Sequence, residues 1–584
     1  MVALGHGALA ADAPVASAEA VYRHGHIYTV DANDRLAEAI AVRAGRIVFV
    51  GSDPDAAQFI GAHTRLVDLD GRFVMPGLID AHLHPLDGGA QLVSCNLDYQ
   101  PLTLEAFRSR IQACLDADRA HEPDGWLEVN GWYRQFMLPS GTDADARSLA
   151  MLKTQRPILV HSTDGHSVLA NERAMSLAHL NRDSKDPSDG KIARDAAGRL
   201  TGIFEDGAHR PLIEAMPAPS TTDTVTMARA ALHALSAQGV TTFLDAAASP
   251  SSIAAFERLA EDHALTARGH FAPVVDAAQA KHPKAVVTQL QTLMAKYQRP
   301  GSAEAPGITI RNAKIFMDGV LQAPAQTAGL LEPYLVDRGE KAEPRFVPGT
   351  KRGDVYFPPE LLTPLLIELA KNGIEPHIHA IGDRSVRQAL DAIASMRTAV
   401  PNPELRVAMA HDELVDARDM PRFAELNVIP VMSFQWAKPG PDSIDAARDF
   451  LGPARFAHME PEGSLNAAHA RIAYGSDWPV DRLGEWFALK VAVTRTGDPT
   501  LGRKYQGRLN QEALLPRATV LRAITMNAAY ALHVDAEVGS LEVGKLADFI
   551  ILDRDPTQVP AEDLANVRVL STLLAGRSVY QAPK

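Results

Sequence analysis

Two histidines separated by one residue end an apolar stretch early in the chain. Residues 75–84 read Met-Pro-Gly-Leu-Ile-Asp-Ala-His-Leu-His, which predicts a short buried strand that ends in His82 and His84. Side chains in a strand alternate between its two faces, so His82 and His84 point to the same side. Two imidazoles on one face of a strand end can bind one metal ion. A single pair of this kind is weak evidence, so further ligands must come from elsewhere in the sequence.

Other residues of metal-ligating types follow apolar runs downstream: Lys314, His379, His411 and Asp477. A lysine inside an apolar strand is costly unless it is paired or neutralised. Lys314 is therefore either a side chain that reaches out of the sheet or one that has captured CO2 as an anionic carbamate able to bridge two metals. Taken alone, His411 is equally explained as a core histidine, and Asp477 as a helix cap or turn residue. The full set, each member at the end of an apolar run, favours a metal centre.

The elements that must position these residues alternate between strands and helices. Strand-like runs at 157–160, 240–244, 308–310, 374–379, 405–411, 428–433 and 471–475 are separated by helical patterns such as 222–238, 359–372 and 385–398. This alternation predicts an α/β fold with a parallel sheet covered by helices. Polar residues at the carboxyl ends of the strands favour a (β/α)8 TIM barrel over residues 75–530. The segment 85–221 is too long for an ordinary connection and is predicted to be an insertion that caps the barrel mouth.

Short strands with turn signals occupy both ends of the chain. Neither 20–74 nor 531–584 is long enough to bury a useful core alone, so we expect them to combine into one small β-sandwich domain. Residues 1–19 are rich in Ala and Gly and are either a disordered leader or the remnant of a signal peptide. Cytoplasmic and periplasmic locations therefore both stay open.

The composition excludes several classes of partner. The net charge is −13 and no Lys/Arg-rich run is present, which argues against nucleic acid and anionic membranes. No apolar stretch approaches the roughly 20 residues that cross a bilayer. A small-molecule substrate is the expected partner, and a homodimer stays open. Cys95 and Cys114 match no zinc motif and are expected as small buried or half-buried hydrophobic residues. A disulfide between them stays open, although nothing requires it.

The chain resembles the amidohydrolase superfamily from about residue 21 to residue 580. Within it, the chain is similar to amidohydrolase family 3, the YtcJ-like metal-dependent hydrolases related to N-substituted formamide deformylase. The motifs that carry the resemblance lie at 75–84, 164–168 with Asn171, 314–319, 377–383, 475–480, 525–529 and 539–548. The resemblance implies a (β/α)8 barrel, a β-sandwich built from both termini, and one or two divalent metals, usually zinc.

Roles for the candidate ligands follow from the resemblance. His82 and His84 would hold the more buried metal, and His379 and His411 the second. Lys314 would be the carboxylated bridge, and Asp477 both a ligand and the general base and acid. Glu205 matches a family glutamate, which leaves three interpretations: a ligand in place of Lys314, a hydrogen-bond partner of a ligand, or a solvated loop carboxylate. The chain departs from the family pattern at Met317 and at the residues before His411.

This ligand set predicts hydrolysis of a carbon–nitrogen bond. Imidazole and carboxylate suit zinc, and a metal lowers the pKa of bound water from about 15.7 to about 7. Metal-activated hydroxide would attack an amide or formamide carbonyl, and Asp477 would pass the proton to the leaving nitrogen. The predicted activity is that of an amidohydrolase acting on bonds other than peptide bonds. Alternatives are a deaminase, a cyclic amide or lactone hydrolase on the same centre, and a non-catalytic metal-binding protein.

Five residues are candidates for contacts with the substrate: His166, Trp132, Asn171, Trp436 and Trp478. His166 is either an electrophile or orienting donor in the pocket or a loop histidine in water. Trp132 belongs to an aromatic cluster at 126–136 that forms either a wall for an apolar substituent or a hydrophobic seam under the insertion. Trp436 and Trp478 follow strand-end positions and are the better pocket candidates.

Overall fold

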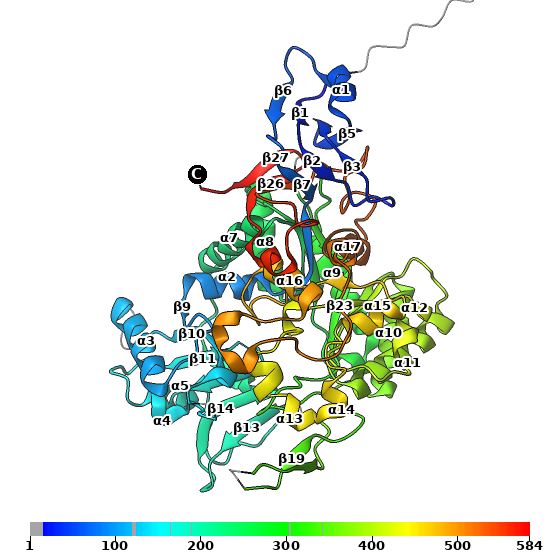
Figure 1. Cartoon of the computed structure of the whole chain (residues 1–584). Helices are drawn as coiled ribbons and strands as arrows, with labels where there is room; N and C mark the ends of the chain where they lie inside the picture. Colours follow the sequence, from blue (N-terminus) through cyan, green and yellow to red (C-terminus); the bar gives the residue numbers. More distant parts are fainter. Residues whose placement is uncertain are drawn as a thin grey trace, which may run out of the picture.

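The chain folds into a mixed α/β structure with parallel strands at its centre (Figure 1). The computed structural model describes residues 16–119, 124–139, 141–163, 165–187, 190–302, 305–340 and 343–583. Most of the predicted leader, residues 1–15, and Asp164 of the motif at 164–168 lie outside the described residues. None of the helices in the described ranges is both long and apolar enough to cross a membrane.

Two parallel sheets hold the strands that end in the candidate ligands. The first has the strand order β17-β16-β15-β8 and the second β18-β21-β22-β23-β24. Their strands are β8 (Leu78–Leu83), β15 (Val240–Ala248), β16 (Arg268–Pro273), β17 (Ile308–Ile310), β18 (Asn312–Phe316), β21 (Glu375–Ala380), β22 (Val407–His411), β23 (Val428–Met432) and β24 (Ala473–Tyr474). Every residue of β8 and of β21 is buried, as expected for parallel strands covered on both faces.

The two sheets meet at both edges. Only Arg311 separates β17 from β18, so the chain passes directly from one sheet to the other. At the opposite edge, the Asp477 N–H donates to the His82 carbonyl at 2.7 Å, and the His84 N–H donates to the Trp478 carbonyl at 2.8 Å. The parallel strands thus form two sheets that adjoin at both edges.

Helices between the strands cover the sheets, and their ends follow local sequence signals. They include α7 (Thr221–Gln238), α8 (Pro250–Glu261), α9 (Pro283–Tyr297), α10 (Pro359–Lys371) and α11 (Asp383–Ala399). The α7 helix begins at a capping box between Ser220 and Asp223 and ends at Gly239, whose φ of 94° suits glycine. The buried residues of α7, such as Leu232 and Leu235, join the same hydrophobic core as Phe243 of β15.

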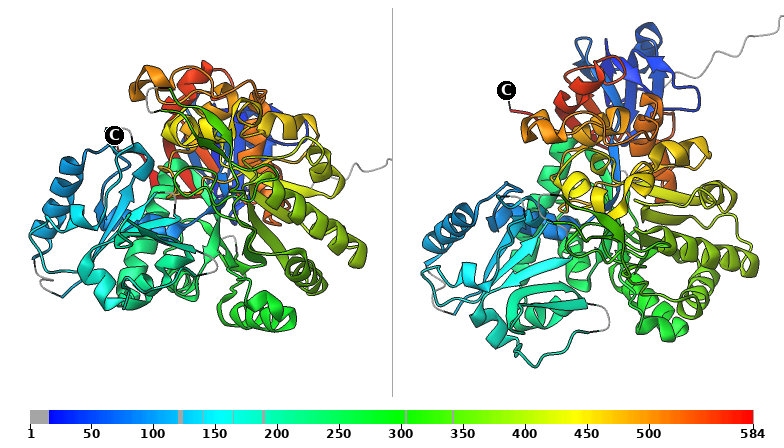
Figure 2. Two further views of the ribbon diagram at one scale, coloured as in Figure 1. Left: turned by 90° about the horizontal axis from the view of Figure 1, so that it is seen from below. Right: turned by 60° about the horizontal axis from the view of Figure 1, so that its bottom comes forward.

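The segment after β8 builds a lobe with its own sheet. Its six strands have the order β13-β14-β12-β11-β10-β9. They are β9 (Cys95–Asn96), β10 (Leu127–Trp132), β11 (Ile158–Ser162), β12 (Ser167–Ala170), β13 (Gly190–Arg194) and β14 (Leu200–Asp206). The helices α3 (Leu104–Ala117), α4 (Ala146–Leu149) and α5 (Glu172–Leu177) pack with it. Figures 1 and 2 show this lobe, in light blue to cyan, beside the parallel strands.

Cys95 and Cys114 form a disulfide, the alternative that the sequence left open beside two separate hydrophobic side chains. Cys95 opens β9 at the edge of the lobe's sheet, and Cys114 lies in α3. The helix buries Ile111 and Leu115 against the lobe core, and this packing brings Cys114 to the strand edge. The sequence could not reveal the pairing because it depends on how α3 docks.

Strands from the two ends of the chain share one sheet. That sheet has the order β27-β26-β25-β7-β2-β3, and a second sheet, β5-β4-β1-β6, contains N-terminal strands only. The strands are β1 (Ala20–Arg23), β2 (His26–Tyr28), β3 (Leu36–Ala37), β4 (Ala39–Arg43), β5 (Arg46–Gly51), β6 (Arg65–Asp68), β7 (Phe73–Pro76), β25 (Phe549–Leu552), β26 (Val569–Leu574) and β27 (Arg577–Gln581). Both sheets contribute to one hydrophobic cluster, in which Tyr22 meets Phe549 edge to face at 5.1 Å between ring centroids. Gly77 links β7 to β8 where a Cβ atom would lie 2.3 Å from Thr241 Oγ1, so only glycine fits.

We expect the disulfide to stabilise the lobe. Replacing Cys95 and Cys114 together by Ala should lower the free energy of unfolding of the lobe by about 3 kcal/mol, because the bond closes a short loop in the unfolded chain. Urea titration followed by hydrogen exchange of α3 measures this loss. In the unmodified protein both thiols should resist iodoacetamide until a reductant is added, and alkylation without reductant would contradict the pairing.

Candidate metal centre

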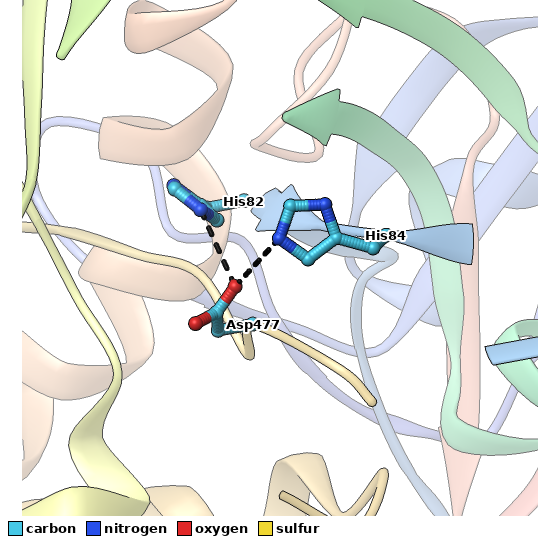
Figure 3. Close-up of side chains that lie close together, drawn as sticks. All are labelled: His82, His84 and Asp477. Atoms are coloured by element: carbon cyan, nitrogen blue, oxygen red, sulfur yellow. Dashed lines mark ion pairs between the residues drawn. The ribbon is translucent and has the colours of Figure 1, made fainter. Parts of the chain in front are cut away.

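His82, His84 and Asp477 converge at the edge where β8 meets the segment after β24 (Figure 3). The Asp477 Oδ1 atom lies 3.3 Å from His82 Nε2 and 3.0 Å from His84 Nε2. In the ranges that the structure describes, these residues are the only group of three or more His, Cys, Asp or Glu whose ligand atoms all lie within 4.8 Å of one another. The two histidines of the strand thus do face the same side, as the period of a strand requires.

The convergent atoms fit a divalent cation. Asp477 Oδ1 is buried and has no hydrogen-bond partner, although two ring nitrogens face it. His411 Nδ1, 4.0 Å from Asp477 Oδ2, is also buried without such a partner. Buried polar atoms without partners are rare in proteins. Two imidazoles and a carboxylate are ligands that zinc and similar ions favour, and an ion among them would satisfy these atoms.

The buried carboxylate of Asp80 links the two segments that carry the cluster. Asp80, in β8, accepts the Ser476 N–H at 2.9 Å and the His82 N–H at 3.1 Å through Oδ1. The Ser476 hydroxyl donates to Asp80 Oδ2 at 2.5 Å. Asp477 has a φ of 55° and His411 a φ of 81°, a left-handed conformation that costs free energy in residues other than glycine. The hydrogen bonds to Asp80 hold Ser476, the neighbour of Asp477, and so support the backbone conformation of Asp477.

Two neighbours contact the ring of His82 directly. His377 Nε2, on β21, lies 2.7 Å from His82 Nδ1. A hydrogen bond at Nδ1 orients the ring and leaves Nε2 for a ligand bond. Lys314, on β18, places its Nζ 3.3 Å from the same Nε2 and is fully buried. His377 therefore contacts the Nδ1 atom of His82, whereas Lys314 and Asp477 both lie near its Nε2 atom.

Burial keeps four of the site's histidines neutral. It lowers the pKa values of His82, His377, His379 and His411 well below the usual range. Neutral imidazole is the form that binds metal. Burial also lowers the pKa of Lys314 to about 7, so a large fraction of the amine is free to react at neutral pH.

Asp477 remains charged despite its burial. Burial alone would raise the pKa of Asp477, but His84, His411 and Lys314 outweigh it and lower that pKa to about 2. Burial would likewise lower the pKa of His84, and the Asp477 carboxylate outweighs this effect and raises it. The site therefore offers one firmly ionised carboxylate, beside His84, whose protonated form it favours, and the neutral imidazoles of His82 and His411.

His379 and His411 adjoin the cluster of three without joining it. The ring centroids of His379 and His411 lie 4.6 Å apart, and those of His82 and His411 4.7 Å apart. His379 Nε2 is 3.1 Å from the Gly319 carbonyl oxygen and 3.6 Å from Asp318 Oδ1. The rings of His379 and His411 therefore lie next to the ring of His82 but outside the group of three.

A cavity of about 610 Å³ opens over the histidines. Its walls come from both the parallel strands and the lobe, and they include Trp436, His166 and Asp206. Trp436 stacks on His411 at 5.1 Å between ring centroids, with an interplanar angle of 13°. His166 lies 6.0 Å from His379 by ring centroids, and its Nδ1 is 2.6 Å from Asp206 Oδ1. The lobe thus places a histidine–aspartate pair opposite the candidate ligands.

Four other candidate residues are not among those that line this cavity. Glu205 Oε1 lies 3.3 Å from an Arg134 guanidinium nitrogen within the lobe. Trp132 is fully buried in the lobe core, and Asn171 caps α5 through its side-chain oxygen. Trp478 is 3% exposed and packs over Gly88, where a Cβ atom would lie 2.5 Å from the indole. An ion pair explains the position of Glu205, a helix cap that of Asn171, and packing that of the two tryptophans.

Three residues at the site were given no role from the sequence: His377, Asp80 and Asp206. His377 precedes His379 by two residues, and Asp80 precedes His82 by two. The two-residue period of a strand could therefore have placed each of them on the same face as a candidate ligand. Asp206 follows Glu205 on β14 and therefore points the other way. Choosing between two adjacent carboxylates required knowing which face of the lobe sheet meets the cavity.

Comparisons with known proteins show the family of the chain. The Amidohydrolase family matches residues 65–580. The chain is 26% identical to Protein LONG AFTER FAR-RED 3 of Arabidopsis thaliana, over 96% of this chain and 92% of the relative. It is 23% identical to N-substituted formamide deformylase of Arthrobacter pascens, over 95% and 97%.

Solved structures share the fold. An uncharacterized metal-dependent hydrolase from Pyrococcus horikoshii OT3 has a TM-score of 0.70 at 21% identity and covers 93% of this chain and 99% of its own. Atrazine chlorohydrolase TrzN from Arthrobacter aurescens TC1, complexed with zinc, has a TM-score of 0.50 at 17% identity, over 96% and 95%.

The contact between His377 and His82 predicts an effect on metal affinity. Replacing His377 by Ala should weaken zinc binding about 10- to 100-fold, as expected when the partner that orients a ligand is lost. Competition with a chromophoric chelator measures the affinity. The matched control is Glu205→Gln, which should leave zinc affinity unchanged because Glu205 pairs with Arg134. Zinc loss in the Glu205 variant alone would instead make Glu205 a ligand.

Proposed function

Because the chain belongs to the Amidohydrolase family, we propose that it is a metal-dependent hydrolase that cleaves a carbon–nitrogen bond of the amide or formamide type. The family match confirms the resemblance drawn from the sequence motifs. The observation that carries the proposal is the convergence of His82, His84 and Asp477 at the floor of a large cavity. A deaminase, or a cyclic amide or lactone hydrolase, would use the same residues and is the alternative activity.

The proposed architecture follows from the two adjoining parallel sheets. Taken together over residues 75–530, they supply the strands of a (β/α)8 barrel, with the segment 85–221 as its insertion. The position of the candidate ligands at the carboxyl ends of the strands supports this assignment. The segments 20–74 and 531–584 would form the β-sandwich domain, supported by the pairing of β7 with β25.

His82, His84 and Asp477 would hold one divalent metal, with zinc best suited to the ligands. Bound there, the metal would supply Lewis-acid polarisation of a carbonyl and a lowered pKa for water. A carbamate on Lys314 would add a carboxylate beside His82, and His379 with His411 would then complete a site for a second ion. Full burial of Lys314 and its pKa of about 7 support this extension.

The proton would be moved by Asp477. Its pKa of about 2 keeps the carboxylate ionised at neutral pH, so it can accept a proton from water and deliver it to the leaving nitrogen. Across the cavity, the Asp206 carboxylate would accept the Nδ1–H of a protonated His166 ring. The Nε2–H of that ring would then donate to the oxygen on which negative charge develops.

Replacing Asp477 by Asn should abolish proton transfer. We expect hydrolysis of an N-formyl amine by zinc-loaded protein to fall by at least about 100-fold, the lower range for loss of a general acid and base. A screen of N-formyl, N-acyl and lactone substrates first identifies the substrate used. Zinc content is measured in parallel, because Asp477 is also a candidate ligand. An unchanged rate in a variant that retains its zinc would overturn the assigned role.

Native mass spectrometry tests the carbamate. The intact protein should carry the additional mass of one CO2, which acid denaturation removes, because carbamates decompose when protonated. Lys314→Arg is the matched control, since a guanidinium keeps the positive charge but is not nucleophilic. If neither protein carries the adduct, the shell consists of His82, His84 and Asp477 around a single ion.

A further inference from the structure

Two buried glutamates lie in the wall of the same cavity, outside the candidate metal ligands. Glu413 follows β22 by two residues, and Glu460 lies just before α15 (Glu462–Ala467). The Glu460 N–H donates to the Glu413 carbonyl at 2.9 Å, so the two backbones adjoin. Each residue is 1% exposed, and both line the cavity.

In the part of the chain that the structure describes, neither carboxylate forms an ion pair. Glu413 Oε2 accepts the amide N–H of Gln322 at 2.9 Å, which is a neutral donor. Glu460 Oε1 is buried without any hydrogen-bond partner. Arg495 donates a hydrogen bond to the Glu460 backbone carbonyl at 2.9 Å, and its guanidinium forms an ion pair with the Glu462 carboxylate at 2.7 Å. Across the described ranges, no ion pair includes the side chain of Glu413 or Glu460.

Such an arrangement is costly in a protein that holds no ligand. A buried carboxylate without a positive partner loses hydration that nothing replaces. Burial, reinforced by Glu413 and Glu462, outweighs the opposing charges of Arg495 and Lys438 and raises the pKa of Glu460 well above its ordinary value. A positive group placed between Glu413 and Glu460 would remove this cost, and the cavity gives such a group access to both residues.

The surrounding wall suits a cation as well. Asp442 and Asp481 also line the cavity, and its nearby lysine, Lys438, is paired with Asp481 at 2.8 Å. Trp436 adds an aromatic ring to the same wall, and aromatic rings next to carboxylates favour organic cations. A substrate carboxylate or phosphate would meet repulsion here.

We propose that Glu413 and Glu460 form a subsite for a positively charged group of the substrate, an amidinium, guanidinium or ammonium. The proposal rests on the hydrolase function proposed above and deepens it, because it assigns the substrate class. The substrate is an amide or formamide whose other end is cationic. That end binds Glu413 and Glu460 while the scissile bond lies over His82, His84 and Asp477.

A pair of probes with the same shape and different charge tests the subsite. Isothermal titration calorimetry at low ionic strength compares n-butylguanidinium with n-butylurea on the zinc-loaded full-length chain. The cation should bind at least about tenfold more tightly, which corresponds to one charge-assisted contact. Glu460→Gln and Glu413→Gln should each reduce this preference, since each keeps the shape and removes a charge.

Asp276→Asn is the matched control. Asp276 is an exposed carboxylate of the same cavity and lies away from the two glutamates in sequence. Its replacement should keep the preference for the cation. Equal affinity of the unmodified protein for both probes overturns the proposal, and this comparison needs no variant to fold. The proposal is also overturned if Asp276→Asn reduces the preference for the cation as much as the two glutamate variants do. The preference would then come from the overall negative charge of the cavity.

The binding test does not require turnover, so the two proposals fail separately. If the chain hydrolyses none of the screened substrates yet binds the cation through Glu413 and Glu460, the hydrolase function fails and the subsite stands. If it hydrolyses neutral amides and shows no preference for the cation, the subsite fails and the hydrolase function stands.

Discussion

The site depends on the junction between β8 and the segment after β24. Two backbone hydrogen bonds, from Asp477 to His82 and from His84 to Trp478, join these segments although almost 400 residues separate Asp80 from Ser476 in sequence. Asp80 completes the junction by accepting hydrogen bonds from both sides. Without it, His82 and His84 would be an ordinary pair at a strand end. With it, an ionised carboxylate reaches both imidazoles, and the positive φ of Asp477 shows that the junction holds a conformation that the local chain disfavours.

The lobe that follows β8 contributes the opposite wall of the cavity. It has its own sheet and hydrophobic cores, so it can position side chains firmly over the ends of the parallel strands. His166 and Asp206 reach the cavity from this lobe. The strand ends therefore determine the candidate metal chemistry, whereas the lobe and the loops after β22 and β23 shape the space available to a substrate.

Charge is distributed unevenly over that space. The candidate ligands include neutral imidazoles because burial lowers their pKa values, and Asp477 is compensated by His84, His411 and Lys314. Glu413 and Glu460, by contrast, form no ion pair within the described ranges. The same low-dielectric surroundings that suit the imidazoles to metal binding make these two carboxylates costly, which is the basis for proposing that they bind a cation.

The sequence by itself determined the elements and the types of ligand. Hydrophobic runs and helical periods located the parallel strands, and the period of a strand placed His82 and His84 on one face. These are local properties that neighbouring residues settle. Tertiary structure decided the rest: that Cys95 reaches Cys114, that Asp206 and not Glu205 faces the cavity, that Trp132, Asn171 and Trp478 pack elsewhere, and that His377 supports His82. Each of these depends on how an element docks against a distant one, and no local pattern encodes that direction.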